Sequence, residues 1–346
     1  MTKIFIAFLS LFVFAFSCTS KKHIKLRVNK PATVTIQSNI NKILIINRSA
    51  PENKVMNVIE GVLSGEIPFE DKMAAEELIA QISNQLSRSN LRTFQVTVAT
   101  ERLKSSSTGS FMPAPLSWTE ISSLARKYNT EAVLVLEYFD TDFKRSDTYK
   151  DIENLVNGQK VVQRQFIATA LGSVKYGLRL YDVNNQTIID ARDLNMSRSW
   201  DATGNTLPEA LAKLINRAEG TKVMARSAAN NYASLLMPYQ LWVNRMYFKK
   251  DRKNNQVQFG ARYAKMFDWE NAQKEWEKVF NGSNPRKGNV TYNLALCHEV
   301  YGNLEEALKL ARMSYAQFGN KYAAQYARQL ERRIRETQVL NQQLGQ

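Results

Sequence analysis

The pattern of apolar and polar positions in residues 31–249 predicts a layered mixture of strands and helices. Residues 42–48 and 131–139 are nearly continuous apolar runs, which is typical of strands covered on both faces. Residues 94–99 alternate between apolar and polar positions. A helical pattern opens at Phe69, and a capping box at Ser117 predicts a second helix. With a further alternating run at 32–36, the order of elements predicts an α/β layer architecture.

The later part of this region alternates over longer stretches. Residues 165–169, 173–181 and 187–195 have the period of strands, and a polar turn at 182–186 separates the last two. We expect an antiparallel meander here. It is followed by a helix from Thr206 that bends at Gly220, and by a final strand at 239–249. The predicted fold class is an α/β (α+β) sandwich-type N-terminal domain with a mixed sheet.

Beyond a charged boundary at 249–255 the pattern is helical to the end, and it repeats. Four positions return 35 residues later with the same spacing: Gly260, Tyr263, Ala272 and Trp276, then Ala295, His298, Ala307 and Ala311. Helix pairs with a period of about 34 residues and small residues at packing positions are typical of tetratricopeptide (TPR) repeats. We therefore predict an all-α, TPR-like helical hairpin domain at 257–346, in which the first repeat lacks the turn glycine that the second has at Gly302.

The first residues predict export. Lys3 precedes an apolar run that is too short to cross about 30 Å of hydrocarbon, so residues 1–17 are interpreted as a signal peptide. Ala15 and Ser17 suit a signal peptidase, and Cys18 stands directly after the predicted cut. This arrangement resembles the lipobox of bacterial lipoproteins and implies that Cys18 is acylated (palmitate or a similar chain). The alternative is an ordinary signal peptide with an incidental cysteine. Residues 18–30 are interpreted as a lipidated tether.

The net charge of the chain and its predicted export limit the classes of molecule that it can bind. The chain has 47 Lys and Arg against 32 Asp and Glu, a net charge of +15, which favours anionic surfaces or acidic proteins. Export excludes nucleic acid. Lys21 and Lys22 stand where surface-directed lipoproteins of some bacteria have acidic residues. We therefore expect a lipid-anchored protein of the cell envelope, at the outer membrane and facing the periplasm.

Two resemblances add to this interpretation. Residues 42–48, 132–138 and 176–182 and the helix from Phe69 resemble the α/β domain of the curli-secretion channel subunit and of the lipoprotein activators of penicillin-binding proteins. The start at Pro31 and the two C-terminal repeats resemble a family of exported bacterial lipoproteins of unknown function, which implies no catalytic residues. The channel resemblance would imply a membrane hairpin at 143–165, but the charged residues there are too costly on a lipid face.

The best candidate for chemistry is the acidic cluster Glu137, Asp140 and Asp142, expected at the end of a strand. Ligands bind beyond the carboxyl ends of strands in α/β folds, so this cluster could hold a divalent cation or act as an acid/base pair in a metal-dependent hydrolase. The competing interpretation is that these acids are only solvated. Cys297 is expected to be a small buried residue and His298 a partly buried structural one. With His23 they cannot assemble a zinc site, and no cofactor is predicted.

The preferred interpretation is a non-catalytic scaffold or adaptor. A TPR pair has a concave groove that binds an extended peptide or a helix, and basic side chains around it favour an acidic protein partner. The residues predicted to bind the partner are Lys274, Lys278, Arg312, Lys321 and Arg328. The alternative function is the hydrolase that uses the acidic cluster.

Overall fold

The computed structural model describes residues 21–49, 70–103, 111–156, 158–251 and 254–346. It divides into two compact units, each described here by itself. The sheet unit comprises residues 30–239 and 339–346, and the helical unit comprises the residues up to 29 and residues 240–338. The predicted signal peptide, Cys18 and the first residues of the predicted tether lie outside the described residues. Among those residues, no helix combines the length and the apolar composition needed to span a bilayer.

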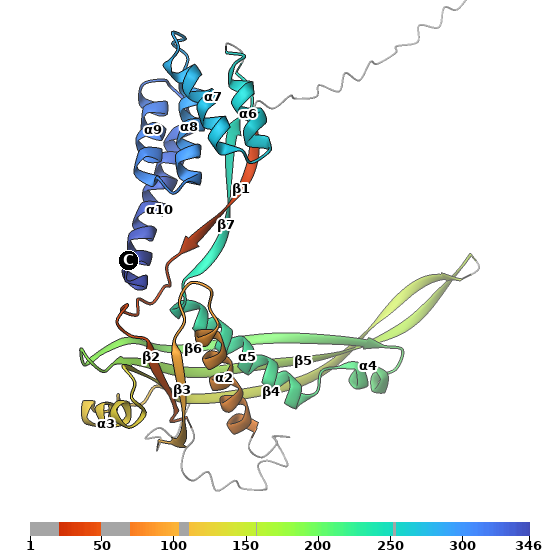
Figure 1. Ribbon diagram of the computed structural model, residues 1–346. Helices are drawn as coiled ribbons and strands as arrows, with labels where there is room; N and C mark the ends of the chain where they lie inside the picture. The colour runs from red at the N-terminus through yellow and green to blue at the C-terminus, as the bar shows by residue number, and fades with distance from the viewer. Residues whose placement is uncertain (1–20, 50–69, 104–110, 157, 252–253) are drawn as a thin grey trace, which may run out of the picture. The chain divides into compact units, whose positions relative to one another are not determined.

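The sheet unit contains a five-stranded mixed sheet with the strand order β3-β2-β4-β5-β6 (Figure 1). The central strand β2 pairs in parallel with both β3 and β4, whereas β4, β5 and β6 form the antiparallel meander predicted from the alternation. The strands are β2 Lys42–Asn47, β3 Gln95–Arg102, β4 Ala132–Val156, β5 Gln159–Asp182 and β6 Thr187–Gly204. The mixed sheet followed by helices confirms the predicted fold class.

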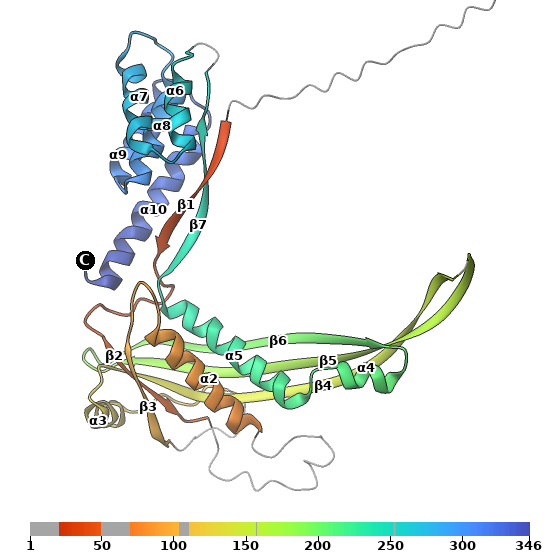
Figure 2. The same cartoon turned by 45° about the vertical axis from the view of Figure 1, so that its right-hand side comes forward.

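Helices cover both faces of this sheet (Figures 1 and 2). On one face, α2 (Glu70–Ser87) and α5 (Arg217–Leu236) form the largest apolar core with the strands, and the short α4 (Leu207–Lys213) packs against β5. On the other face lies α3 (Trp118–Tyr128). Its predicted capping box is present, since the Ser117 hydroxyl accepts the N–H of Glu120 and the Glu120 carboxylate accepts the N–H of Ser117.

Three local predictions for the sheet unit were wrong. Residues 32–36 form no strand, although Val34 and Ile36 still bury their side chains in the core beside α2 and α5. The helix from Thr206 breaks at 214–216, before Gly220, because Asn216 caps a new helix by accepting the N–H of Glu219 at 2.9 Å. Strand β4 does not end near Phe139 but continues to Val156.

The continuation of β4 forms a long hairpin with β5. The two strands pair from Ala132↔Asp182 to Val156↔Gln159, while β6 pairs with β5 only as far as Phe166↔Gly204. The last part of the hairpin therefore extends past β6 as a two-stranded arm (Figure 2). Its polar residues are compatible with a strand because the arm has no apolar layer on its faces.

The helical unit contains a two-stranded ribbon, β1 (Lys21–Lys30) with β7 (Tyr239–Phe248), and a series of helices. The helices are α6 Val257–Lys265, α7 Trp269–Asn281, α8 Gly288–Val300, α9 Leu304–Ala316 and α10 Ala323–Leu344, whose last residues count with the sheet unit. Residues 21–30, which we expected to be a tether, are thus a strand. Ile24 and Val28 alternate with charged residues and are buried, which stabilises the strand.

The small residues of the predicted repeat lie where the helices of each pair meet. A side chain at Gly260 of α6 would approach Trp276 Nε1 of α7 to 2.5 Å, and that indole nitrogen donates to the carbonyl of Val257 at 2.9 Å. Ala272, Ala307 and Ala311 are fully buried. The periodic small residues therefore permit close packing of α6 on α7 and of α8 on α9.

Candidate functional site

The structure does not bring the predicted acidic cluster together. Glu137 lies in a β-bulge, where the pairing of β4 with β5 shifts between Leu136 and Tyr138, and its side chain is fully buried. Asp142 is exposed and pairs with Lys144 at 2.9 Å. The expectation of a strand end was wrong because β4 runs on as the hairpin, so these acids do not converge at a sheet edge. Within the described ranges, no group of three or more His, Cys, Asp or Glu could hold a metal ion.

Glu137 is instead the centre of a buried ion-pair network. It accepts from Arg48 Nη1 at 2.9 Å and from Arg179 Nη1 at 2.7 Å, and both arginines are nearly buried. Arg48 Nη1 also donates to the carbonyl of Ala114, and Arg179 Nη2 donates to the carbonyl of Pro113. Burial raises the pKa of Glu137, although the two guanidinium groups act in the opposite direction. This network connects β2, β4 and β5 to the segment before α3.

The five residues predicted to bind a partner come from α7, α9, α10 and the segment before α10. Lys274 and Lys278 of α7 pair with Glu270 and Glu275, each at 2.7 Å, and Arg312 of α9 pairs with Glu331 at 2.9 Å. The Lys321 ammonium lies 5.5 Å from the centre of the Tyr322 ring, and Arg328 is exposed on α10. Neighbouring glutamates thus pair with three of the five residues.

The two candidate reactive residues of α8 are structural. Cys297 is fully buried, and burial raises the pKa of its thiol far above the usual range, which makes it a poor nucleophile. His298 is partly buried, and its Nδ1 is buried without a hydrogen-bond partner among the described residues. Both observations agree with the interpretation of these residues from the sequence.

The feature of the helical unit that most resembles a binding site is the way α8 holds the ribbon. Asn293 of α8 is fully buried, and its amide accepts the backbone N–H of Phe248 at 2.8 Å while donating to the Phe248 carbonyl at 2.9 Å. The Phe248 ring packs edge-on against Tyr292, with ring centres 5.4 Å apart. The helix therefore recognises both the backbone and the side chain of an extended segment.

A buried glutamate on the same helix makes a second contact between α8 and the ribbon. Glu299 accepts two hydrogen bonds from Arg245 of β7, each at 2.7 Å, one from Arg333 at 2.7 Å and one from the Tyr326 hydroxyl at 2.8 Å. Burial alone would raise the pKa of Glu299, but the hydrogen bonds and charges of Arg245 and Arg333 outweigh it, so the pKa lies below its ordinary value. Burial also raises the pKa of Tyr326, which keeps its hydroxyl a donor.

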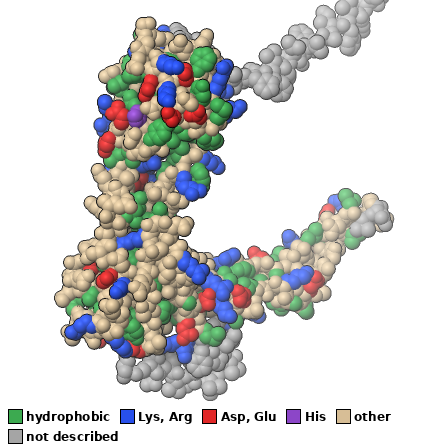
Figure 3. All heavy atoms as spheres, in the orientation of Figure 1, with side chains coloured by type: hydrophobic (Ala, Val, Ile, Leu, Met, Phe, Trp, Pro, Cys, Tyr) green, Lys and Arg blue, Asp and Glu red, His purple; other side chains and the backbone are tan. Residues whose placement is uncertain are grey.

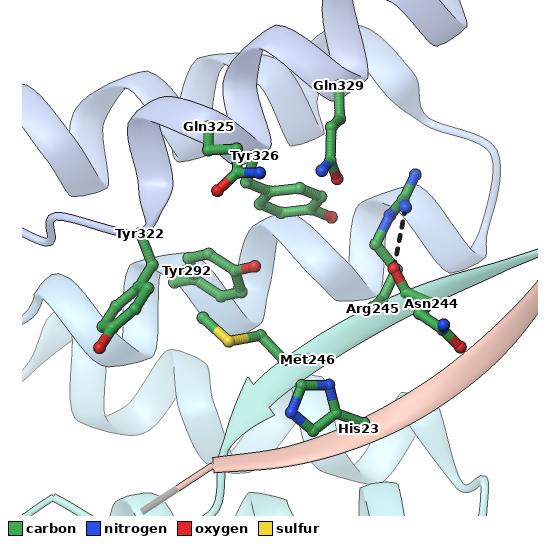
Figure 4. Close-up of a pocket in the computed structure, with 9 residues that line it drawn as sticks. All are labelled: His23, Asn244, Arg245, Met246, Tyr292, Tyr322, Gln325, Tyr326 and Gln329. Carbon is green, nitrogen blue, oxygen red and sulfur yellow. Dashed lines mark hydrogen bonds between the residues drawn. The ribbon is translucent and has the colours of Figure 1, made fainter.

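Beside these contacts lies a pocket of about 230 Å³ between the ribbon and α10 (Figure 4). The ribbon contributes His23, Asn244, Arg245 and Met246 to its lining, α8 contributes Tyr292, and Tyr322, Gln325, Tyr326 and Gln329 come from the start of α10 and the residue before it. Figure 4 shows the amides of Gln325 and Gln329 directed from α10 toward the ribbon. The Lys21 ammonium lies 3.4 Å from the centre of the Tyr322 ring, at the same end of the helix.

The side chains that line this pocket suit the binding of a peptide side chain. Its amides, imidazole and phenol rims donate and accept hydrogen bonds, while Arg245 is already held by Glu299. A volume of about 230 Å³ accommodates one large side chain of a peptide. Sequence reasoning set His23 aside and did not single out Asn293 or Glu299. A polar residue inside the otherwise apolar run 292–297 of α8 was the available signal for Asn293.

Comparison with known proteins identifies two domains of unknown function. The family model of DUF8603 matches residues 40–248, and that of DUF6340 matches residues 258–332. No curated protein matches the chain. Together these two models span the described sheet and most of the helical series.

Similar solved structures include three bacterial proteins with low sequence identity. PelC from Paraburkholderia phytofirmans, solved as a dodecamer, is 12% identical, and the match covers 62% of this chain and 98% of PelC with a TM-score of 0.22. A putative neuraminyllactose-binding hemagglutinin homolog from Helicobacter pylori is 16% identical over 59% of this chain and 87% of its own, with a TM-score of 0.28. Lipoprotein GNA1162 from Neisseria meningitidis is 14% identical over 56% of this chain and 98% of its own, with a TM-score of 0.15. These TM-scores are too low to support a functional argument.

Proposed function

The chain belongs to the family defined by the domain of unknown function DUF8603, and we propose that it acts as a non-catalytic, lipid-anchored adaptor of the bacterial cell envelope. In this proposal its helical unit, a short TPR-like array, recruits a protein partner, and Cys18 carries the lipid. The protein would lie at the outer membrane and face the periplasm.

The observation that supports recruitment is the pocket beside a strand that the helices already bind. Asn293 and Glu299 hold β7 through its backbone and through Arg245, which is how a helical array binds an extended peptide. The pocket lies directly beside this bound strand and is lined from both the ribbon and α10. A partner segment would place one side chain in the pocket, and Lys21 near its rim favours an acidic segment.

The start of β1 supports the membrane anchor. Strand β1 begins at Lys21, three residues after Cys18. Three residues span at most about 10 Å. Acylation of Cys18 would therefore hold the helical unit close to the lipid surface, where envelope partners are concentrated.

The proposal is tested by filling the pocket. Gln329→Trp adds a bulky ring to the pocket lining, whereas Lys309→Trp adds the same ring at an exposed position of α9. Both variants should keep the wild-type circular dichroism spectrum. Affinity capture from membranes, quantified by mass spectrometry, should recover the same envelope protein with wild type and Lys309→Trp and lose it with Gln329→Trp. Equal recovery with both variants would refute the pocket as the binding site.

A further inference from the structure

The outward face of α6 has large apolar side chains beside basic ones. Phe259, Arg262 and Met266 follow one another at helical spacing, and all three are exposed, Phe259 by 42% and Met266 by 67%. Phe267, the next residue, is 70% exposed. The opposite face of α6, with Val257, Gly260, Ala261 and Ala264, is buried against the helical unit. Figure 3 shows apolar, basic and acidic side chains intermixed over this unit.

Phe267 also has an unfavourable backbone conformation. Its φ is +62°, in the left-handed region that disfavours residues with a side chain. The corresponding turn residue of the second helix pair, 35 positions later, is Gly302, with a φ of +83°. A phenylalanine at this position does not relieve the strain of the positive φ, and its exposed ring does not fill the apolar core. A strained backbone that exposes an aromatic ring points to a contact outside the chain.

Basic side chains lie beside the apolar side chains of this tip. Helix α6 has no acidic residue, and Arg262 and Lys265 lie in its last turn. Two acids follow in the sequence. Asp268 is committed to capping α7, since it accepts the N–H of Asn271 at 3.1 Å, and Glu270 pairs with Lys274 at 2.7 Å. Arg262 and Lys265 therefore place positive charge next to Met266 and Phe267, while Asp268 keeps its negative charge as the cap of α7.

We propose that the α6–α7 tip, formed by Phe259, Met266 and Phe267 with Arg262 and Lys265, is a membrane-contact site that inserts into the interface of an anionic bilayer. Aromatic side chains with a polar surrounding favour the head-group region, and basic residues add attraction to anionic lipids. The inference rests on the proposed lipid anchor in one respect: Cys18 precedes β1 of the same unit and would keep this unit at the membrane. The tip then acts as the second of two signals, which stable anchoring by a lipid chain needs.

The test measures lipid contact at Phe267 in the acylated mature protein reconstituted into vesicles containing phosphatidylglycerol. Phe267→Cys is labelled with a polarity-sensitive dye, because the native Cys297 is buried, and Tyr315→Cys on α9, also exposed, is the control. We expect the dye at position 267 to shift to shorter wavelength and to be quenched by lipid-borne quenchers. The dye at position 315 should show neither effect. Identical emission at position 267 with and without vesicles would overturn the inference.

A second arm removes the aromatic side chain without a dye and without the acyl group. Mature chain with Cys18→Ser is floated with the same vesicles, alone and combined with Phe267→Gly or with the control Tyr315→Ser. Phe267→Gly should reduce the bound fraction roughly tenfold while the thermal midpoint stays equal or rises, since glycine suits this φ. Binding of the Phe267→Gly variant equal to that of the Cys18→Ser parent would contradict a membrane contact. Detection by mass spectrometry of a Cys18 peptide without an acyl group would refute the proposed anchor. It would not affect the flotation result, because that experiment uses a chain without the acyl group.

Discussion

The side-chain amide of Asn293 satisfies both the N–H and the carbonyl of Phe248, with hydrogen bonds of 2.8 and 2.9 Å. This pair joins α8 to β7 in the way that a peptide-binding array holds the backbone of its ligand. The face of α8 that carries Asn293 is therefore occupied by the chain's own strand. A partner has to bind beside β7, where the pocket lies.

Asn293→Ala should destabilise the helical unit by about 2–4 kcal/mol, because two buried backbone groups of Phe248 lose their partner. Urea unfolding followed by circular dichroism measures this free energy. Gln329→Ala, which removes an amide from the pocket without leaving a buried backbone group unpaired, should change it by less than about 0.5 kcal/mol. Equal effects would mean that the Asn293 amide is not needed to hold the strand.

Glu299→Gln should cost about 3–5 kcal/mol, because the buried charge of Arg245 and the partly buried charge of Arg333 would lose their counter-charge. The folded-state pKa of Glu299 is depressed, so its stabilising contribution is complete above the unfolded value of about 4.3 and is lost as pH falls through the lower, folded value. Wild type should thus lose stability below about pH 4.3 more steeply than Glu299→Gln. Parallel curves in that pH range would show that folding does not lower the pKa of Glu299.

Arg312→Gln is the matched control for that substitution. Arg312 pairs with Glu331 at 2.9 Å, but its side chain is exposed by 63%. Solvent screens such a pair, so the loss should be at most about 1 kcal/mol. A loss as large as that of Glu299→Gln would mean that burial does not explain the difference.

The Cys297 thiol should react with a water-soluble disulfide reagent only when the protein unfolds. Its side chain is fully buried, and burial raises its pKa, so thiolate is scarce in the fold. The measurement is the labelled fraction at neutral pH with and without urea. Rapid labelling of the native protein would contradict the packing of α8.

Glu137→Gln and Asp142→Asn should differ sharply in their effect on folding. Glu137 is enclosed by Arg48 and Arg179, so neutralising it should cost about 3–5 kcal/mol. Asp142→Asn removes only an exposed pair with Lys144 and should change the free energy of unfolding by at most about 1 kcal/mol. Chemical denaturation of both variants measures the two losses in the free energy of unfolding. Losses of similar size would contradict the structural role of the buried Glu137.

Local and periodic features could be predicted from the sequence. The capping box at Ser117 and Glu120 involves residues three apart, and Gly260 and Trp276, which pack against each other, are sixteen apart. Strand β1 was missed although Ile24 and Val28 alternate with charged residues, because its basic composition and its place after the leader favoured a tether. Pairing with β7 makes these residues a strand despite their basic composition.

The site itself depends on contacts between distant parts of the chain. Phe248 and Asn293 are 45 residues apart, and Arg48 and Glu137 are 89 apart. No spacing rule predicts which buried polar residue pairs with which strand. Glu137 shows the consequence: the sequence placed it in an acidic cluster, whereas the fold surrounds it with arginines.

The structure also changes how the adaptor hypothesis is tested. Deleting residues 257–346 would remove the helices that cover Tyr247 and Phe248, two buried residues of β7. Such a truncation would expose an apolar ribbon and would not isolate the role of the helices. Point variants around the pocket avoid this problem.

The most direct measurement is site-specific photo-crosslinking in cells that make the full chain, with a photoreactive amino acid in place of Gln325 at the pocket. Lys309 on α9 is the control position. The account predicts one discrete adduct with an envelope protein from position 325, absent from position 309 and lost when Gln329→Trp fills the pocket. An adduct of equal yield from both positions, or none from position 325, would contradict a partner-binding pocket beside β7.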